Sequence, residues 1–178
     1  MSAASVRGMD THALLTDAFH RIPALARRHA EGADDNLLHT RPDAGANTLA
    51  WLLWHTARQA DAQVAALAGR DQVWTTDGFV ERFGLSLDPA DHGYGHSPEQ
   101  VAAVRVDDPQ LLVDYQDAVT AMVDDYLATA DADELDRVVD DSYDPPVTAG
   151  VRLISVLGDA LQHLGQAGYV RGLLERSR

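Results

Sequence analysis

Apolar residues recur at spacings of three and four along four stretches of the chain, the period of an α-helix with one buried face. Helix-capping and helix-stopping residues bound these stretches: Asn47 is a good N-cap, Gly69 stops the second stretch, and Thr148 caps the last. The four predicted helices cover residues 11–30, 47–68, 108–130 and 147–176. The pattern predicts an all-α fold, a four-helix bundle of up-and-down or crossover connectivity, formed as a single domain over residues 1–178.

The second predicted helix changes character along its length. Its first turns, Leu49 to Trp54, are apolar on every side, which predicts deep burial. Its later turns carry polar and charged residues, which predict a solvent-exposed face: Arg58, Gln59, Asp61 and Gln63.

A long loop separates the second and third helices. Residues 69–107 contain no long helical pattern, and loops of this length usually shape a site. We expect one or two helical turns between Gly78 and Gly84, anchored by two Phe, and a capped turn beginning at Ser97. Three residues of the loop are candidates for contact with a ligand: Arg82, Tyr94 and His96. The alternative is a surface lid held in place by its phenylalanines.

A metal site is predicted between the second and the last helix. Asp159 and His163 are four residues apart, so their side chains lie one turn apart on the same side of a helix. His55, at the end of the buried aromatic run, can supply a third ligand from a facing helix. Two histidines and one carboxylate leave coordination positions open, and Zn²⁺ is the expected metal, with Ni²⁺ or Fe²⁺ as alternatives. The competing interpretation is a hydrogen bond from Asp159 that only orients His163.

Composition excludes several classes of partner and of chemistry. The net charge of −14 argues against nucleic acid and anionic membranes, whose phosphates need clustered basic residues. No apolar run reaches the roughly 18 residues that span a bilayer, and the first ten residues lack a signal sequence, so we expect a cytoplasmic protein. The chain contains no cysteine, so any thiol chemistry must use a thiol from outside.

Three motifs resemble the DinB-like metal-dependent four-helix proteins, and among them the mycothiol-dependent maleylpyruvate isomerase and thiol S-transferase branch. They are Leu-Leu-Trp-His55-Thr-Ala-Arg, Gly-Phe-Val-Glu-Arg-Phe-Gly-Leu in the long loop, and His163-Leu-Gly-Gln166-Ala-Gly-Tyr169-Val-Arg171-Gly. Many members of the superfamily use three histidines, and Asp159 stands here in the place of one of them. A carboxylate in that place fits the isomerase pattern, although Asp is one methylene shorter than the Glu found there.

The resemblance implies a metal-dependent S-transferase or isomerase with mycothiol as co-substrate, acting on an electrophile. Trp51 and Tyr169 are candidates for the walls of the substrate site, and Arg171, inside the apolar arc of the last helix, should pair with a carboxylate of the protein or of a ligand. The alternative is a non-catalytic metal-binding or stress-related module. Metal-assisted hydrolysis ranks last, with His96 or Asp61 as the base. The sequence does not decide whether two copies pair as a homodimer.

Overall fold

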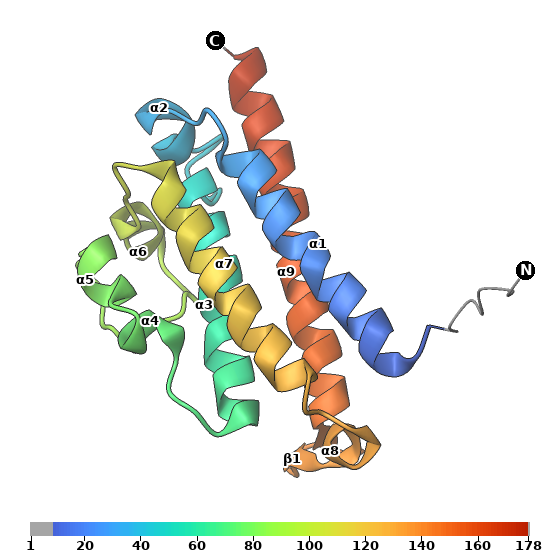
Figure 1. Ribbon diagram of the computed structural model, residues 1–178. Helices are drawn as coiled ribbons and strands as arrows, with labels where there is room; N and C mark the ends of the chain where they lie inside the picture. The colour runs from blue at the N-terminus through green and yellow to red at the C-terminus, as the bar shows by residue number, and fades with distance from the viewer. Residues whose placement is uncertain (1–8, 178) are drawn as a thin grey trace, which may run out of the picture.

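Four long helices pack side by side in the computed structural model, which describes residues 9–177 (Figure 1). They are α1 (Thr11–Ala30), α3 (Leu49–Ala68), α7 (Pro109–Leu127) and α9 (Ala149–Arg176). The all-α bundle is thereby confirmed. The segment Met1–Gly8, where no signal sequence is expected, lies outside the described residues. Over the part of the chain that is described, no helix combines the length and apolarity needed to cross a membrane.

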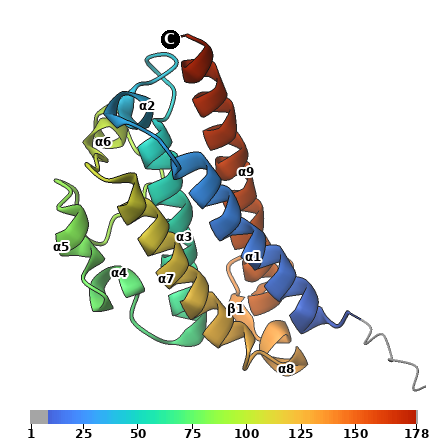
Figure 2. The same ribbon diagram turned by 45° about the horizontal axis from the view of Figure 1, so that its top comes forward.

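The bundle has a crossover connection. Helices α3 and α7 run in the same direction, and α1 and α9 run the opposite way, so the chain between α3 and α7 must return along the bundle (Figures 1 and 2). This return is the long loop of residues 69–108, and it holds three short helices: α4 (Val73–Thr76), α5 (Phe79–Phe83) and α6 (Pro98–Ala103). The two predicted anchors, Phe79 and Phe83, pack on Tyr115 of α7, with ring centroids 4.8 and 5.8 Å from that of Tyr115.

Short elements at the two ends of the bundle were not predicted. Helix α2 (Asp35–His39) covers the end at which α3 begins, and Thr48 rather than Asn47 caps α3 by accepting a hydrogen bond from the amide of Trp51. At the other end lie α8 (Ala132–Asp136) and a two-stranded antiparallel sheet of β1 (Val138–Asp140) and β2 (Val147–Thr148). The prediction of Asn47 as the N-cap is therefore wrong, and the small sheet was not anticipated.

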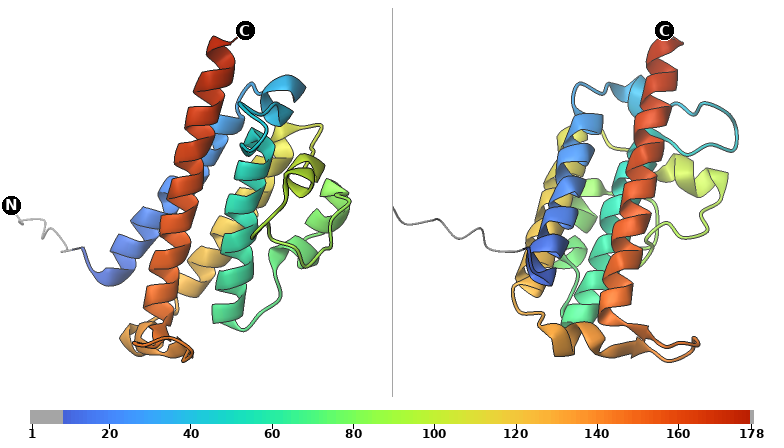
Figure 3. Two further views of the ribbon diagram at one scale, coloured as in Figure 1. Left: turned by 180° about the vertical axis from the view of Figure 1, so that it is seen from behind. Right: turned by 90° about the vertical axis from the view of Figure 1, so that its right-hand side faces the viewer.

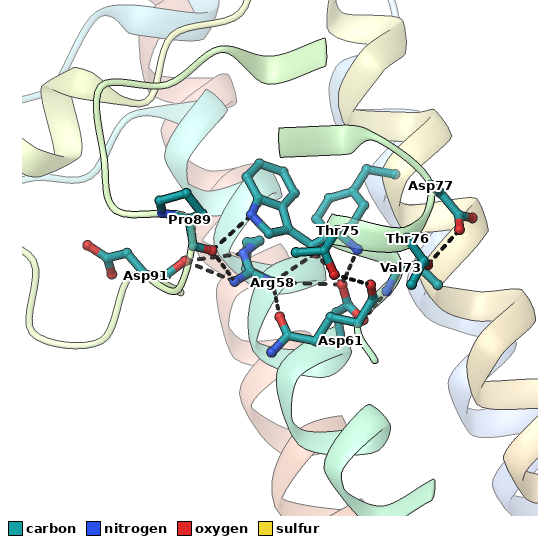
Figure 4. A network of polar contacts seen from close by, with 11 residues as sticks. Arg58, Asp61, Val73, Thr75, Thr76, Asp77, Pro89 and Asp91 are labelled. Atoms are coloured by element: carbon teal, nitrogen blue, oxygen red, sulfur yellow. Dashed lines mark hydrogen bonds and ion pairs between the residues drawn. The ribbon is translucent and has the colours of Figure 1, made fainter. Parts of the chain in front are cut away.

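The predicted solvent-exposed face of α3 is also wrong. Arg58, Gln59 and Asp61 are buried, because the long loop and α9 cover this part of the helix. The Asp61 carboxylate accepts hydrogen bonds from the Tyr115 hydroxyl at 2.8 Å and from the amides of Val73 and Trp74 at 3.0 and 2.8 Å. Arg58 lies 3.7 Å from the same carboxylate (Figure 4). The hydrogen bonds to the buried Asp61 carboxylate thus tie α3 to α4 and α7, and they leave Asp61 unavailable as a catalytic base.

Replacing Asp61 by Ala should destabilise the fold by about 3–5 kcal/mol, because it leaves the Arg58 guanidinium buried without its counter-charge. Two backbone amides lose their acceptor in the same substitution. Asp17→Ala is the matched control, since Asp17 forms an exposed ion pair with Arg21 one turn away on α1, and should cost about 0.5 kcal/mol or less. Urea unfolding of both variants measures the difference. Equal losses in the two variants would show that the buried pair does not stabilise the fold.

Candidate metal centre

Three potential metal ligands converge where α3 packs against α9. These two helices lie side by side along most of their length (Figure 3), and the side-chain amide of Gln59 on α3 donates to the carbonyl of Val156 on α9. One Asp159 oxygen lies 4.0 Å from Nε2 of His55 and the other lies 3.5 Å from Nε2 of His163. The two imidazoles meet edge to face, with ring centroids 4.7 Å apart.

Both histidines are oriented so that Nε2 faces the centre of this group. Nδ1 of His55 donates to the carbonyl oxygen of His92 at 2.6 Å, and Nδ1 of His163 donates to Oε1 of Gln166 at 3.0 Å. A hydrogen on Nδ1 leaves Nε2 with a free lone pair in the neutral ring. A second hydrogen bond of this kind is the usual arrangement for a metal-binding histidine.

The protonation states of the three side chains also favour the binding of a cation. Burial lowers the pKa of His55 to about 4, despite the opposing effect of its hydrogen bond to His92, so this imidazole is neutral at neutral pH. The hydrogen bond with His163 lowers the pKa of Asp159, and the same contact raises the pKa of His163. An ionised carboxylate therefore stands beside a buried neutral imidazole and a second imidazole, which binds a metal in its neutral form.

The surroundings of His55 are built for an imidazole ring. The Trp51 indole stacks on it with ring centroids 4.5 Å apart and an interplanar angle of 14°. Gly93 of the long loop packs against the Nδ1 edge of the ring, where a Cβ would lie 2.5 Å from Nδ1 of His55 and 3.2 Å from the Trp51 indole. Gly93 also has a φ of +98°, which side chains rarely adopt. Only glycine fits here.

The three residues fit a divalent metal. Their donor atoms all lie within 4.8 Å of one another. A cation with bonds of about 2.0–2.2 Å holds its donors about 3–4 Å apart, so small side-chain rotations close the set, and the shorter Asp side chain reaches far enough. The exposed fraction of the side chain is 8% for His55, 17% for His163 and 42% for Asp159. Solvent thus approaches from the Asp159 side.

Two of the predicted substrate contacts lie elsewhere in the structure. Arg82 pairs with Asp114 of α7 at 2.8 Å and lies over the ring of Phe79. Arg171 pairs with Glu175 at 2.8 Å, as its place in the apolar arc required, and also donates to the carbonyls of His29 and Glu31 at the end of α1. Its guanidinium therefore caps the C-terminus of α1, and neither arginine is brought to the three metal ligands.

The other predicted substrate contacts differ in how far they are buried. The side chains of Trp51 and His96 are buried next to His55, and the Trp51 indole Nε1–H donates to Nδ1 of His96 at 3.0 Å. Tyr94 is 88% exposed and follows Gly93 directly in the loop that covers His55. Tyr169 is exposed on α9 and borders a pocket of about 370 Å³ together with Gln166.

Gln166, Gly93 and the carbonyl of His92 are parts of the site that were not predicted. Gln166 lies three residues after His163 on the same helix, so its spacing was a usable signal. Sequence spacing gave no comparable signal for Gly93 and His92. They lie in the long loop, and only the path of that loop brings them to His55.

Two comparisons with known proteins found matches. A family model described as the DinB superfamily matches residues 18–167. The chain belongs to the DinB superfamily. The structure of this DinB protein is similar to a crystal structure described as the conserved protein of locus from Enterococcus faecalis, with a TM-score of 0.87 and 34% sequence identity over 93% of this chain and 97% of that one. No curated protein matches the chain. The resemblance found in the sequence is confirmed for the superfamily.

If the three ligands hold a metal, this DinB protein should bind one divalent ion per chain, and the His55→Ala, His163→Ala double variant should bind none. The two substitutions remove both nitrogen ligands and leave only a carboxylate. His20→Ala is the matched control, because His20 contacts a carboxylate too, Asp124 at 2.9 Å, but on the surface.

Inductively coupled plasma measurement after reconstitution with Zn²⁺, Ni²⁺ or Fe²⁺ gives the metal content of each protein. The control should keep the content of the parent. Equal content in the parent and the double variant would place the metal at another site.

Proposed function

We propose that this protein is a metal-dependent S-transferase that activates a low-molecular-weight thiol of the mycothiol type and joins the whole thiol, through its sulfur, to an electrophile. The observation that carries the proposal is the open ligand set, in which two imidazole Nε2 atoms and a half-exposed carboxylate converge with solvent on one side. Three protein ligands leave at least one position for an exogenous group, as in catalytic rather than structural zinc sites.

The composition of the chain supports a borrowed nucleophile. The sequence has no cysteine, so no thiolate of the protein can attack an electrophile or occupy the metal. A bound divalent cation supplies Lewis acidity that lowers the pKa of a coordinated thiol, so that thiolate is present at neutral pH. Small thiols of this kind are kept reduced in the cytoplasm, and a cytoplasmic location is part of the proposal.

The residues of the chain hold and shield the reacting sulfur. His55 is fixed by the His92 carbonyl on one edge and by the Trp51 indole on one face, so water is excluded from the α3 side. Asp159 is the most exposed of the three ligands and marks the side from which a substrate enters. Its charge balances that of a divalent ion in part, which favours an anionic sulfur as the next ligand.

A neighbouring pocket has room for the rest of a thiol. It is bounded by Gln166, which also holds His163, and by Leu52 and Tyr169. Asp43 and Asn47 add polar groups to its edge, so the pocket offers both an aromatic wall and hydrogen-bonding partners to a hydroxylated molecule. This mixture suits a thiol that carries sugars, such as mycothiol. In this proposal Tyr94, exposed beside Gly93, covers the other edge of the site.

The proposal predicts that zinc-loaded protein consumes mycothiol faster than metal-free protein when an electrophile such as monobromobimane is present. In this reaction a carbon–sulfur bond forms, the carbon–bromine bond breaks, bromide leaves and the thiol proton passes to solvent. Glutathione, cysteine and bacillithiol run in parallel test the choice of thiol, because the pocket discriminates by the part of the molecule beyond the sulfur. Fluorescence of the bimane product gives the rate.

The His55→Ala, His163→Ala double variant is the negative control and His20→Ala the positive control. A zinc-dependent rate that vanishes in the double variant supports the transferase. No rate above the metal-free protein with any thiol, across several classes of electrophile, would contradict the proposal and favour a metal-binding module without turnover.

A further inference from the structure

One segment of the long loop, residues 91–96, holds His55 at the Nδ1 edge of its ring. The carbonyl of His92 accepts the hydrogen of His55 Nδ1, and Gly93 packs directly against the ring. His96, at the end of the segment, contacts the indole that stacks on the same ring. The position of this segment therefore decides how the ligand is oriented.

Asp91 fixes the turn that presents the His92 carbonyl. Its Oδ1 accepts a hydrogen bond from the amide of Gly93 at 3.1 Å, which closes a local side-chain turn around His92. The same oxygen lies 2.8 Å from Nε2 of His96. One carboxylate thus contacts both ends of the segment.

The contact with His96 continues to His55 through Trp51. The indole nitrogen is only a donor, so Nδ1 of His96 must accept its hydrogen, and the proton of that imidazole must be on Nε2, facing Asp91. The His96 side chain is buried, and so is Trp51. The carboxylate of Asp91 therefore lies beside the Nε2–H of His96, in an ion-pair contact rather than a directed hydrogen bond, and favours the His96 tautomer that accepts from Trp51, the indole stacked on His55.

The main chain of Asp91 is held as well. Nε and Nη2 of Arg58 donate to the Asp91 carbonyl at 3.2 and 3.0 Å, and Nη2 also approaches the carbonyl of Pro89 (Figure 4). Arg58 follows His55 by less than one turn on α3, so the loop is attached to the same helix that carries the ligand. The buried pair of Arg58 and Asp61 therefore supports the Asp91 side of the metal site.

We propose that Asp91 is a positioning residue that keeps His55 in the tautomer with hydrogen on Nδ1 and Nε2 free to bind metal. The competing tautomer has a partner nearby, because Nε2 of His55 lies 4.0 Å from Asp159 and can donate to it once the His92 carbonyl moves away. In that tautomer the lone pair needed by a metal is lost. The inference rests on the metal site of the proposed function.

The test compares Asp91→Ala with Asp88→Ala in the metal-free protein. Asp88 lies in the same loop and makes the same kind of local turn, accepting from the amide of Ala90 at 2.8 Å. Long-range ¹H–¹⁵N NMR of the imidazoles at neutral pH reports which nitrogen of His55 carries hydrogen. The parent and Asp88→Ala should show Nδ1–H, and Asp91→Ala should show mostly Nε2–H.

Zinc affinity, measured by competition with a chelator, is the second readout. Asp91→Ala should bind about 10–100-fold more weakly than the parent, as expected for loss of a group that orients a ligand, and Asp88→Ala should match the parent. Asp91→Asn is measured beside them in case the alanine variant does not fold. This variant keeps an acceptor for the Gly93 amide but loses the charge that faces His96. Its His55 should therefore also shift toward Nε2–H, and it should also bind zinc more weakly than the parent.

The outcomes separate the two claims. If Asp91→Ala and Asp91→Asn keep the Nδ1–H tautomer and the affinity of the parent, the positioning role is wrong while the metal site stands. If the parent binds no zinc, the proposed function fails, and the tautomer of the metal-free protein still decides whether Asp91 positions His55.

Discussion

The burial of one uncharged imidazole organises the functional half of this bundle. His55 lies in the apolar first turns of α3, and a buried ring nitrogen without a partner is costly. The long loop meets this requirement with a backbone carbonyl on Nδ1, which leaves Nε2 directed at Asp159 and His163. The same loop must approach the ring closely, and this requires glycine at position 93.

The crossover connection gives the loop its role. Because α3 and α7 run in the same direction, the chain has to return along the bundle (Figure 2). On the way it covers the polar half of α3. Arg58 and Asp61 are buried by this segment and bind it in return, Asp61 through amides of α4 and Arg58 through the carbonyl of Asp91. The connection that the helix directions require, residues 69–108, thus also forms one wall of the candidate metal site.

The sequence was sufficient for whatever depends on spacing along one helix. The four long helices and the alignment of Asp159 with His163 follow from a period of 3.6 residues. The buried aromatic run before His55 indicated that the second helix supplies the third ligand. Spacing does not show which segment covers a polar face, so Arg58, Gln59 and Asp61 were placed in solvent. Arg171 shows the same limit, since its place among apolar residues predicted a carboxylate partner, which is Glu175, but not its hydrogen bonds to carbonyls at the end of α1.

X-ray absorption spectroscopy of the zinc-loaded protein measures the central claim most directly. The account predicts a first coordination sphere of light atoms only, with the multiple-scattering signature of two imidazoles, a carboxylate oxygen and at least one exchangeable position whose scatterer becomes sulfur when a thiol is added. A sphere without imidazole scattering, or a closed four-ligand sphere that a thiol leaves unchanged, would contradict an open site formed by His55, Asp159 and His163.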